Sequence, residues 1–533
     1  MKKNIVIVGG GHNGLVVAAY LAKAGHEVTV LEKRSVVGGC ASSDTTTFPG
    51  FTISTAAYLN SLFLPEIVED LSLRQHGYEV FPRDPSSFTP LPDGRFLMLG
   101  PDMAFNQSEI AKFSLKDVKA YPWYEKKLSG VAKWMAGLMT MTPPNFFTKV
   151  WLPKTLRNWV RLFQVLWYAR KLFPLKIFTL LRLIFSDPVK YLDSWFESDV
   201  LKATLLTDAL IGATKLSGYV LLHHVMGESG GARGVWAYQK GGMGGIANAL
   251  KSVALSYGAH ICCNAEVIEI GTESLFMDKL LVKFKQGDDK PCSMFADVVV
   301  SNLDVKNTLS KIRERERKKD RLMKSNEAID YSSASMKINL VLSGLPDFQA
   351  CPGTVPGPQH RGTIHIAPSV EYILRALREL ADGRFSSLPM LELTIPSVLD
   401  PTLAPKGMQV MNVFTQFFPY GETFNKYAYW EYHVLPLLRS YITNIDNIIC
   451  DVQIFTPNDL ESEFGLSGGN LFHGALSLGK LFSLRPARGI ADYRTPISGL
   501  YLCGASTHPG GGVTGAPGYN AAREILEDIG KSD

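Results

Sequence analysis

The chain opens with two short apolar runs separated by a helical pattern. Residues 5–8 (IVIV) and 28–31 (VTVL) have the β-branched composition of buried strands. Between them, residues 15–24 (LVVAAYLAKA) are mostly small and apolar, and Gly25 follows as a natural helix stop. The pattern predicts a strand–helix–strand unit of a parallel sheet.

The end of the chain has a similar order of elements. Residues 499–503 (GLYLC) form a short apolar run, residues 504–518 are rich in glycine, and residues 519–529 have a helical pattern. The sequence therefore predicts a second strand–loop–helix unit, far from the first. Two long insertions, roughly residues 70–230 and 310–460, lie between the two ends.

Segment 149–190 has an unusual pattern inside the first insertion. Leu156, Val160, Phe163 and Trp167 recur at helical spacing, and the segment holds nine basic residues against one acid, Asp187. A basic amphipathic helix suits an anionic membrane surface. The alternative is a helical lid whose apolar stripe packs on its own core.

If the segment contacts lipid, its cations are the expected contacts. They include Arg157, Arg161, Arg170 and Lys171. A second charged run, residues 311–324 (KIRERERKKDRLMK), alternates in sign and is predicted to be a solvated helix.

The first loop carries a complete GxGxxG pattern. Gly9 permits a tight turn, Gly11 lets the backbone approach a pyrophosphate, and Gly14 allows close helix–strand packing. Glu32 ends the second strand 18 residues after Gly14, where an acid can bind a ribose diol. An acid at this place also argues against a 2′-phosphate, so the unit predicts a dinucleotide site.

A second glycine loop favours FAD over NAD. Residues 38–42 (GGCAS) follow Glu32 closely, and a double glycine here is similar to the extended fingerprint of FAD-dependent oxidoreductases. Cys40 raises the alternative of a flavin disulfide reductase. Residues 45–47 are all threonine, so the redox partner cysteine is missing at that spacing.

A further glycine stretch, residues 242–247 (GMGGIA), fits a relaxed GxGxxA and could indicate a separate NAD site. The residues before it, 234–240 (GVWAYQK), make a poor buried strand because they end in two polar residues. We therefore favour a single dinucleotide site.

Composition and charge exclude other classes. The 533 residues are 46% hydrophobic and 20% charged, which is ordinary for a globular enzyme, and a net charge of +5 is too close to neutral for a nucleic-acid binder. The seven cysteines form no CxxC and no zinc spacing, so we expect no metal and a reducing compartment. No run reaches the ~18 apolar residues of a spanning helix, and we expect no signal or transit peptide.

The glycine-rich stretch 504–518 closely resembles the C-terminal motif of the carotenoid desaturase/isomerase family, the phytoene desaturase-like flavoproteins. Residues 236–243 (WAYQKGGM), 265–267 (AEV) and 297–302 (DVVVSN) look like the family's central FAD segment and return strand. Residues 221–227 (LLHHVMG) and 468–474 (GGNLFHG) resemble the branch containing the animal pyridine nucleotide-disulfide oxidoreductase domain-containing protein 2. The resemblance covers essentially the whole chain. It departs at Ala505, where many related amine oxidases have an acid.

The resemblance implies an α/β fold: a discontinuous Rossmann-type FAD-binding domain, an interleaved α+β substrate domain and a helical lid. The expected boundaries are FAD-binding domain 1–70, 231–310 and 465–533, and substrate domain 71–230 and 311–464, with the lid at 145–200.

FAD is the expected cofactor, bound without a covalent link. Its predicted contacts are Gly9, Gly11, His12, Asn13, Gly14, Glu32, Lys33, Gly38, Gly39, Cys40, Ala41, Val267, Gly504, Ala505, Gly512 and Val513. No catalytic set of side chains can be assigned from the sequence. His473 and His508 are the candidates for lining the ring, whereas the adjacent His223 and His224 are expected to be structural.

The implied activity is an FAD-dependent desaturation, saturation or isomerisation of a hydrophobic polyene, isoprenoid or lipid-like molecule. The alternative from another class is a flavin-bound regulatory or interaction protein with little turnover. We expect a cytoplasmic protein with no nucleic-acid partner. Peripheral contact with membranes through residues 149–190 is the alternative to a lid that packs on its own core.

Overall fold

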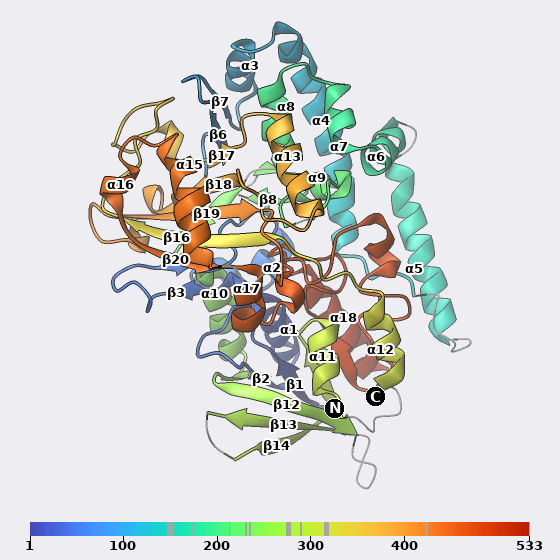
Figure 1. Ribbon diagram of the computed structural model, residues 1–533. Helices are drawn as coiled ribbons and strands as arrows, with labels where there is room; N and C mark the ends of the chain where they lie inside the picture. The colour runs from blue at the N-terminus through green and yellow to red at the C-terminus, as the bar shows by residue number, and fades with distance from the viewer. Residues whose placement is uncertain are drawn as a thin grey trace.

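The computed structural model describes residues 1–145, 153–172, 175–212, 214–229, 232–233, 236–272, 279–287, 290–313, 319–421 and 425–531. A parallel sheet lies near the two chain ends, a second and larger sheet lies beyond it, and a group of helices covers the top (Figure 1).

The parallel sheet has five strands in the order β11-β2-β1-β15-β21. Their bounds are Asn4–Val8 (β1), Glu27–Leu31 (β2), His260–Cys262 (β11), Val298–Ser301 (β15) and Leu500–Leu502 (β21). Strand β15 pairs in parallel with β1 on one side and with β21 on the other. The predicted strands from the two chain ends therefore belong to one sheet, and the predicted discontinuous Rossmann-type α/β class is confirmed.

Each face of this sheet is covered by a different layer. One layer contains helices α1 (His12–Lys23), α10 (Gly244–Ser256) and α18 (Ala516–Gly530). The other is an antiparallel sheet of β12 (Ala265–Thr272), β13 (Leu280–Gln286) and β14 (Cys292–Ala296). Because side chains alternate along β1, Ile5 and Ile7 join the helical core while Val6 and Val8 join the core with β12 and β13. The uniformly apolar pattern of β1 follows from burial on both faces.

The alternative NAD site at residues 242–247 is absent from the part of the chain that the structure describes. Strand β10 (Ala237–Gln239) pairs antiparallel with β5 (Val80–Pro82) in a two-stranded sheet. It therefore cannot begin a second Rossmann unit. The glycine turn that follows β10 instead approaches Ser43, whose hydroxyl accepts a hydrogen bond from Gly244 N at 2.9 Å.

The larger sheet has seven strands in the order β20-β16-β19-β18-β17-β6-β7. Their bounds are Ser87–Pro90 (β6), Phe96–Leu99 (β7), Ser335–Leu342 (β16), Thr363–Ile366 (β17), Met390–Thr394 (β18), Gln409–Gln416 (β19) and Ile449–Phe455 (β20). All neighbours are antiparallel except β17 and β6. The apolar residues on one face form a core with α15 (Leu435–Arg439) and α16 (Ile445–Ile448), while the polar residues lie on the opposite face.

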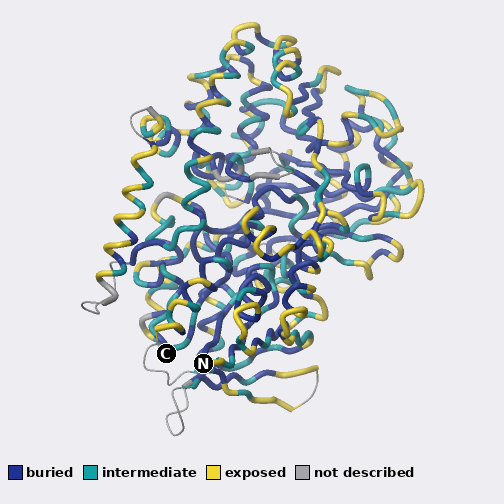
Figure 2. The backbone as a smooth tube through the Cα atoms, turned by 180° about the vertical axis from the view of Figure 1, so that it is seen from behind, coloured by how far each residue is buried: buried dark blue, intermediate teal, exposed yellow. Residues whose placement is uncertain are grey.

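The helical group comes mainly from the first insertion. Its members are α3 (Met103–Ala111), α4 (Leu115–Met139), α5 (Pro153–Ala169), α6 (Leu175–Phe185), α7 (Pro188–Asp193), α8 (Asp199–Thr207), α9 (Gly218–Val225) and α13 (Val370–Ala381). Among the described residues, none of these helices is long and apolar enough to cross a membrane. Helix α5 lies at the edge of the molecule, with one side turned outward (Figures 1 and 2).

The expectation that Arg157 and Arg161 contact lipid is wrong. Both are on the protein side of α5, where they form ion pairs with acids of α18. Arg157 Nη1 lies 3.1 Å from Asp528 Oδ1, and Arg161 binds Glu524. The side of α5 opposite these arginines is the apolar one, so the helix turns its apolar stripe outward.

The remaining described β-strands and α-helices are short. They are β3 (Ser43–Asp44), β4 (Ile53–Ser54), β8 (Glu228–Ser229), β9 (Ala232–Arg233), α2 (Pro65–Asp70), α11 (Val305–Lys311), α12 (Lys319–Glu327), α14 (Lys426–Tyr429) and α17 (Pro457–Phe464). Residues 314–318 of the predicted charged helix lie outside the described residues, between α11 and α12.

Candidate functional site

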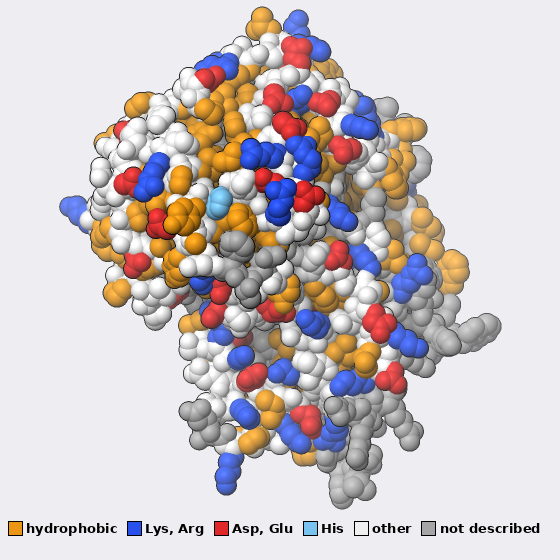
Figure 3. Space-filling view, in the orientation of Figure 1, with side chains coloured by type: hydrophobic (Ala, Val, Ile, Leu, Met, Phe, Trp, Pro, Cys, Tyr) orange, Lys and Arg blue, Asp and Glu red, His pale blue; other side chains and the backbone are white. Residues whose placement is uncertain are grey.

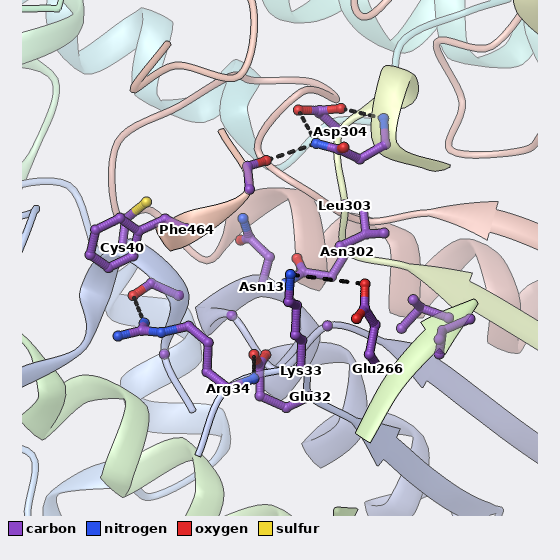
Figure 4. A pocket seen from close by; sticks show the side chains of 18 of the residues that line it. Asn13, Glu32, Lys33, Arg34, Cys40, Glu266, Asn302, Leu303, Asp304 and Phe464 are labelled. Carbon is purple, nitrogen blue, oxygen red and sulfur yellow. Dashed lines mark hydrogen bonds and ion pairs between the residues drawn. The ribbon is translucent and has the colours of Figure 1, made fainter. Parts of the chain in front are cut away.

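A cleft of about 290 Å³ opens at the carboxyl ends of β1, β2 and β15. This edge of a parallel α/β sheet is where ligands bind as a rule. The first residues of α1 form one wall of the cleft, and Figure 4 shows Asn13, Glu32 and Asn302 around it. The cleft therefore occupies the place where the glycine pattern predicts a dinucleotide.

The glycines of the first loop make close approaches that a side chain would block. Gly9 has φ +93°, a left-handed conformation that glycine adopts without strain. A Cβ added to Gly11 would lie 2.6 Å from Asn302 Nδ2. A Cβ added to Gly14 would lie 2.4 Å from the carbonyl oxygen of Gly9. The backbone conformation of Gly9 and the close approaches at Gly11 and Gly14 thus explain each glycine of the pattern separately.

Glu32 is held at the end of β2 by two backbone donors. Gly10 N donates to Glu32 Oε2 at 2.6 Å, and Arg34 N donates to Glu32 Oε1 at 2.8 Å. Burial raises the pKa of Glu32, and these two hydrogen bonds oppose that shift. The two bonds fix the carboxylate at the wall of the cleft, where oxygen lone pairs remain for further donors.

Cys40 lies in the cleft as a free thiol, and no disulfide joins any cysteines among the described residues. Burial raises the pKa of Cys40 to about 12, with a smaller opposing effect of Arg34. A reactive cysteine needs a lowered pKa, so the environment of Cys40 does not favour disulfide reductase chemistry.

A second cavity of about 130 Å³ adjoins the cleft. Four residues line both spaces: His12, Cys40, His473 and Ala505. The residues that line only the second cavity are mostly apolar, and they include Ala56, Ala57, Leu59, Leu62, Ile211, Trp236, Phe414, Leu471 and Val513. A polar cleft and an apolar cavity thus meet at one set of residues.

Several buried polar atoms in these spaces have no hydrogen-bond partner among the described residues. They are His12 Nε2, Asn13 Oδ1 and His473 Nδ1. Burial, with a smaller effect of His473, lowers the pKa of His12 to about 3. Burial also lowers the pKa of His473. Asp304 opposes this shift, and Arg485 adds to it. Because buried polar groups are normally paired, these atoms fit a site that a polar ligand completes.

The predicted FAD contacts fall into three groups. Those in the cleft are Gly9, Gly11, His12, Asn13, Glu32, Lys33, Gly38, Gly39, Cys40, Val267 and Ala505. Gly512 and Val513 line the apolar cavity. Gly14, Ala41 and Gly504 line neither space. A Cβ added to Gly504 would lie 2.6 Å from Asn302 O, so this glycine allows close packing of the backbone.

The two candidate histidines are in different environments. His473 lines both spaces, in a left-handed conformation with φ +54°. His508 lines neither; its Nε2 is 2.9 Å from Leu138 O, and its ring packs edge-on against Phe482. The side chains of His223 and His224 lie outside the described residues. Among the residues that are described, no group of His, Cys, Asp and Glu is arranged to hold a metal ion.

Sequence reasoning missed a polar set next to the apolar cavity. Tyr58 lines that cavity, and its hydroxyl donates to Glu392 Oε2 at 2.8 Å. Burial, followed by Glu392, raises the pKa of Tyr58. Lys337 Nζ lies 5.6 Å from the centre of the Tyr58 ring and donates to Asn412 Oδ1 at 2.8 Å. Burial lowers the pKa of Lys337.

Three of these residues, Lys337, Glu392 and Asn412, come from the polar face of the seven-stranded sheet, whereas Tyr58 lies outside that sheet. Residues 335–342 (SMKINLVL) and 409–416 (QVMNVFTQ) alternate between polar and apolar positions over part of their length. Such alternation usually indicates one face in water. Here both faces are buried, with Lys337 and Glu392 only 1% and 2% exposed. Polar alternation in two strands of a long insertion is thus the signal that could have located the set.

The fold and the site together define a Rossmann-type FAD-dependent oxidoreductase. The model of the NAD(P)-binding Rossmann-like domain matches residues 7–65. A solved structure of an engineered putrescine oxidase shares the fold, with a TM-score of 0.58 at 15% identity over 100% of this chain and 99% of that one. The predicted FAD cofactor agrees with this class.

The chain belongs to the family of pyridine nucleotide-disulfide oxidoreductase domain-containing protein 2. The protein of that name from Rattus norvegicus is 39% identical over 98% of this chain and 93% of its own length. A more distant relative is 4,4′-diapophytoene desaturase of Staphylococcus haemolyticus, 25% identical over 98% of this chain and 99% of its own. The resemblance to desaturase-like flavoproteins seen in the sequence is confirmed.

Proposed function

We propose that the protein oxidises, saturates or isomerises a hydrophobic small molecule of polyene, isoprenoid or lipid-like type at a bound FAD. The observation that carries this proposal is the apolar cavity that joins the cofactor cleft at His12, Cys40, His473 and Ala505. An apolar cavity with few polar groups suits a hydrophobic ligand. The relative named as a diapophytoene desaturase supports the same substrate class.

The residues of the two spaces fit FAD along their whole length. Gly9, Gly11 and the first residues of α1 would hold the pyrophosphate, because backbone N–H groups at a helix N-terminus attract anions. Glu32 would bind the ribose and Val267 would lie by the adenine. Ala505, Gly512 and Val513 would border the ring.

When bound, FAD supplies two-electron redox chemistry for the substrate. The chain itself offers Tyr58 for handling a proton. The Tyr58 hydroxyl, at the cavity wall, donates to the buried carboxylate of Glu392. When the hydroxyl oxygen accepts a proton from the substrate, the hydroxyl's own proton can pass to Glu392.

The test mixes purified, FAD-loaded protein without oxygen with three probes: diapophytoene, limonene and a long-chain unsaturated lipid. Mass spectrometry of small molecules that co-purify adds further probes. We expect at least one to bleach the oxidised flavin or to return as an isomer. Tyr58→Phe should lower turnover about 100-fold with unchanged FAD content. Tyr372→Phe, which loses a hydroxyl bonded to Pro389 O outside both spaces, should not.

Two outcomes would contradict this function. Protein that takes up no FAD would remove its basis. Protein that holds FAD but neither reduces it with any probe nor isomerises one would favour the alternative, a flavin-bound regulatory or interaction protein.

We further propose that the outward side of α5 and α6 rests on an anionic membrane. The exposed apolar side chains there include Trp159, Phe163 and Trp167, which are 58%, 66% and 55% exposed. Orange side chains at this edge of the molecule are visible in Figure 3, where Figure 1 places α5 and α6. Exposed cations flank them at Arg170, Lys171, Lys176 and Arg182. Aromatic residues with flanking cations complement an anionic lipid surface, and each cation adds roughly 1 kcal/mol near it.

Flotation with vesicles of phosphatidylcholine and phosphatidylglycerol tests this surface at low and high salt. The wild type should float at low salt, and the triple variant Trp159→Ser, Phe163→Ser, Trp167→Ser should not. The double variant Tyr427→Ser, Tyr432→Ser removes exposed aromatic rings elsewhere and should float like the wild type. A wild type that stays in the soluble fraction, or a triple variant that loses self-association instead, would contradict membrane contact.

A further inference from the structure

A single buried arginine lies between the two loops that border the apolar cavity. Arg485 is 2% exposed, and each of its hydrogen bonds goes to a backbone carbonyl oxygen. Nε donates to Thr507 O (3.2 Å), Nη1 to Gly474 O (3.2 Å) and Ala475 O (3.3 Å), and Nη2 to Phe472 O (2.6 Å) and Ala505 O (3.0 Å). The guanidinium group therefore uses its full set of N–H donors on two loops.

The positive charge of Arg485 is not neutralised by an acid. Among the residues that the structure describes, no Asp or Glu forms an ion pair with it, in contrast to Arg494, which binds Asp492, Glu524 and Asp528. Burial lowers the pKa of Arg485 to about 10, a value that still leaves the group charged at neutral pH. Buried charges normally have a charged partner, so an anion bound near Arg485 would be stabilised by its charge.

The positive charge of Arg485 lies next to residues that line the apolar cavity. Nη2 binds the carbonyl groups of Phe472 and Ala505, and both residues line the apolar cavity. Burial lowers the pKa of His473, which lines both spaces; Asp304 opposes this shift, and the charge of Arg485 adds a smaller effect in the same direction as burial. Arg485 therefore places a buried positive charge behind the wall of the apolar cavity, which Gly512 and Val513 also line, whereas Gly9 lines only the cleft.

We propose that Arg485 sets the reduction potential of the bound flavin by stabilising its reduced, anionic form. The inference rests on the proposed function in one respect, namely that FAD binds with its ring at this cavity. When the ring takes up two electrons from a substrate and one proton, it carries one negative charge more than the oxidised ring. A fixed positive charge in a site of low dielectric constant lowers the free energy of that state. Arg485 acts through the field and is not a catalytic residue.

The experiment measures the potential of FAD in the full-length protein by slow enzymatic reduction beside a reference dye. Arg485→Met should shift the reduction equilibrium at least tenfold toward the oxidised flavin, which is about 30 mV for a two-electron couple. Arg485→Lys keeps the charge and should stay within threefold of the wild type. Sulfite is a second probe, because its addition leaves a negative charge on the flavin. Its Kd should rise at least tenfold in Arg485→Met and not in Arg485→Lys.

Arg494→Met is the matched control. It removes a buried arginine whose charge is already neutralised, so it should lower the unfolding temperature and leave potential and sulfite affinity unchanged. This control separates loss of stability from loss of charge. If Arg485→Met does not fold, Arg485→Gln takes its place in the same two measurements. In addition, wild-type FAD must have a higher reduction potential than free FAD and must bind sulfite.

Three results would overturn the inference. One is Arg485→Met with bound FAD, wild-type potential and wild-type sulfite affinity, which would show that Arg485 only joins two loops. Another is a loss of FAD affinity with an unchanged potential, which would place the charge at the pyrophosphate. The third is a wild type whose FAD has the potential of the free cofactor. A wild type that binds no FAD contradicts the proposed function instead, and a wild type that binds FAD without any turnover leaves the inference testable as stated.

Discussion

Protein carrying Gly11→Val is expected to leave purification without flavin and to bind FAD about 100-fold more weakly afterwards. Gly11 is the residue before α1, and a Cβ there would lie 2.6 Å from Asn302 Nδ2 on the opposite side of the loop. Its φ of −66° suits any residue, so the effect comes from space and not from backbone strain. The end of the Asn302 side chain can turn aside, so most of the loss is expected from the valine side chain entering the cleft where the backbone of Gly11 would approach the pyrophosphate. A loss of about 2.8 kcal/mol corresponds to a Kd increase of about 100-fold.

The measurement is FAD binding by fluorescence quenching to the apoprotein, with thermal unfolding of each apoprotein as a check on folding. Gly479→Val is a matched control, because a Cβ at Gly479 meets nothing within 4 Å. It should bind FAD like the wild type. Wild-type affinity in Gly11→Val would show that the cleft at the start of α1 does not hold the cofactor.

The ends of the chain could be predicted from the sequence because local patterns decide their structure. Strands β1 and β2 have apolar runs that match burial on both faces, and the glycines between β1 and α1 each have one steric reason. Helix α18 begins at Ala516, before the predicted residue 519, because the turn at Gly515 and Pro517 already sets the helical start.

The orientation of α5 could not be predicted, because a helical period describes both faces of a helix equally well. Trp159 and Phe163 are large and apolar, and the pattern alone is consistent both with packing on a core and with contact to lipid. Their actual exposure follows from Arg157 and Arg161 on the other face, whose partners lie in α18 at the far end of the chain. Long-range ion pairs have no signal in local sequence.

The polar set around Tyr58 was missed for a related reason. Lys337 and Glu392 lie in strands of the second insertion, where alternation normally indicates solvent on one face. The structure covers that face, so residues that look like surface positions are buried, and burial lowers the pKa of Lys337. Burial by a distant part of the chain converts an ordinary strand pattern into a candidate site.

Glu524→Gln is expected to lower the free energy of unfolding by about 3–5 kcal/mol, the usual loss when one partner of a buried ion pair is removed. The carboxylate of Glu524 binds Arg161, and Arg494 Nη1 lies 2.7 Å from its Oε2, with all three side chains at most 14% exposed. Glutamine keeps the shape but leaves two buried guanidinium groups without this charge.

Urea unfolding of the full chain measures the change, with Glu527→Gln as the matched control one turn along α18. Glu527 pairs with Arg157 at 3.5 Å and with Lys531, but its side chain is 43% exposed. Exposed pairs contribute less than about 1 kcal/mol, so the control should change little. Equal effects of the two substitutions would mean that the network does not anchor α5. Arg157 and Arg161 hold α5 against α18 by its polar side. A loosened network should therefore also weaken flotation with anionic vesicles. Intact flotation in Glu524→Gln would show that the apolar face of α5 points outward without this anchor.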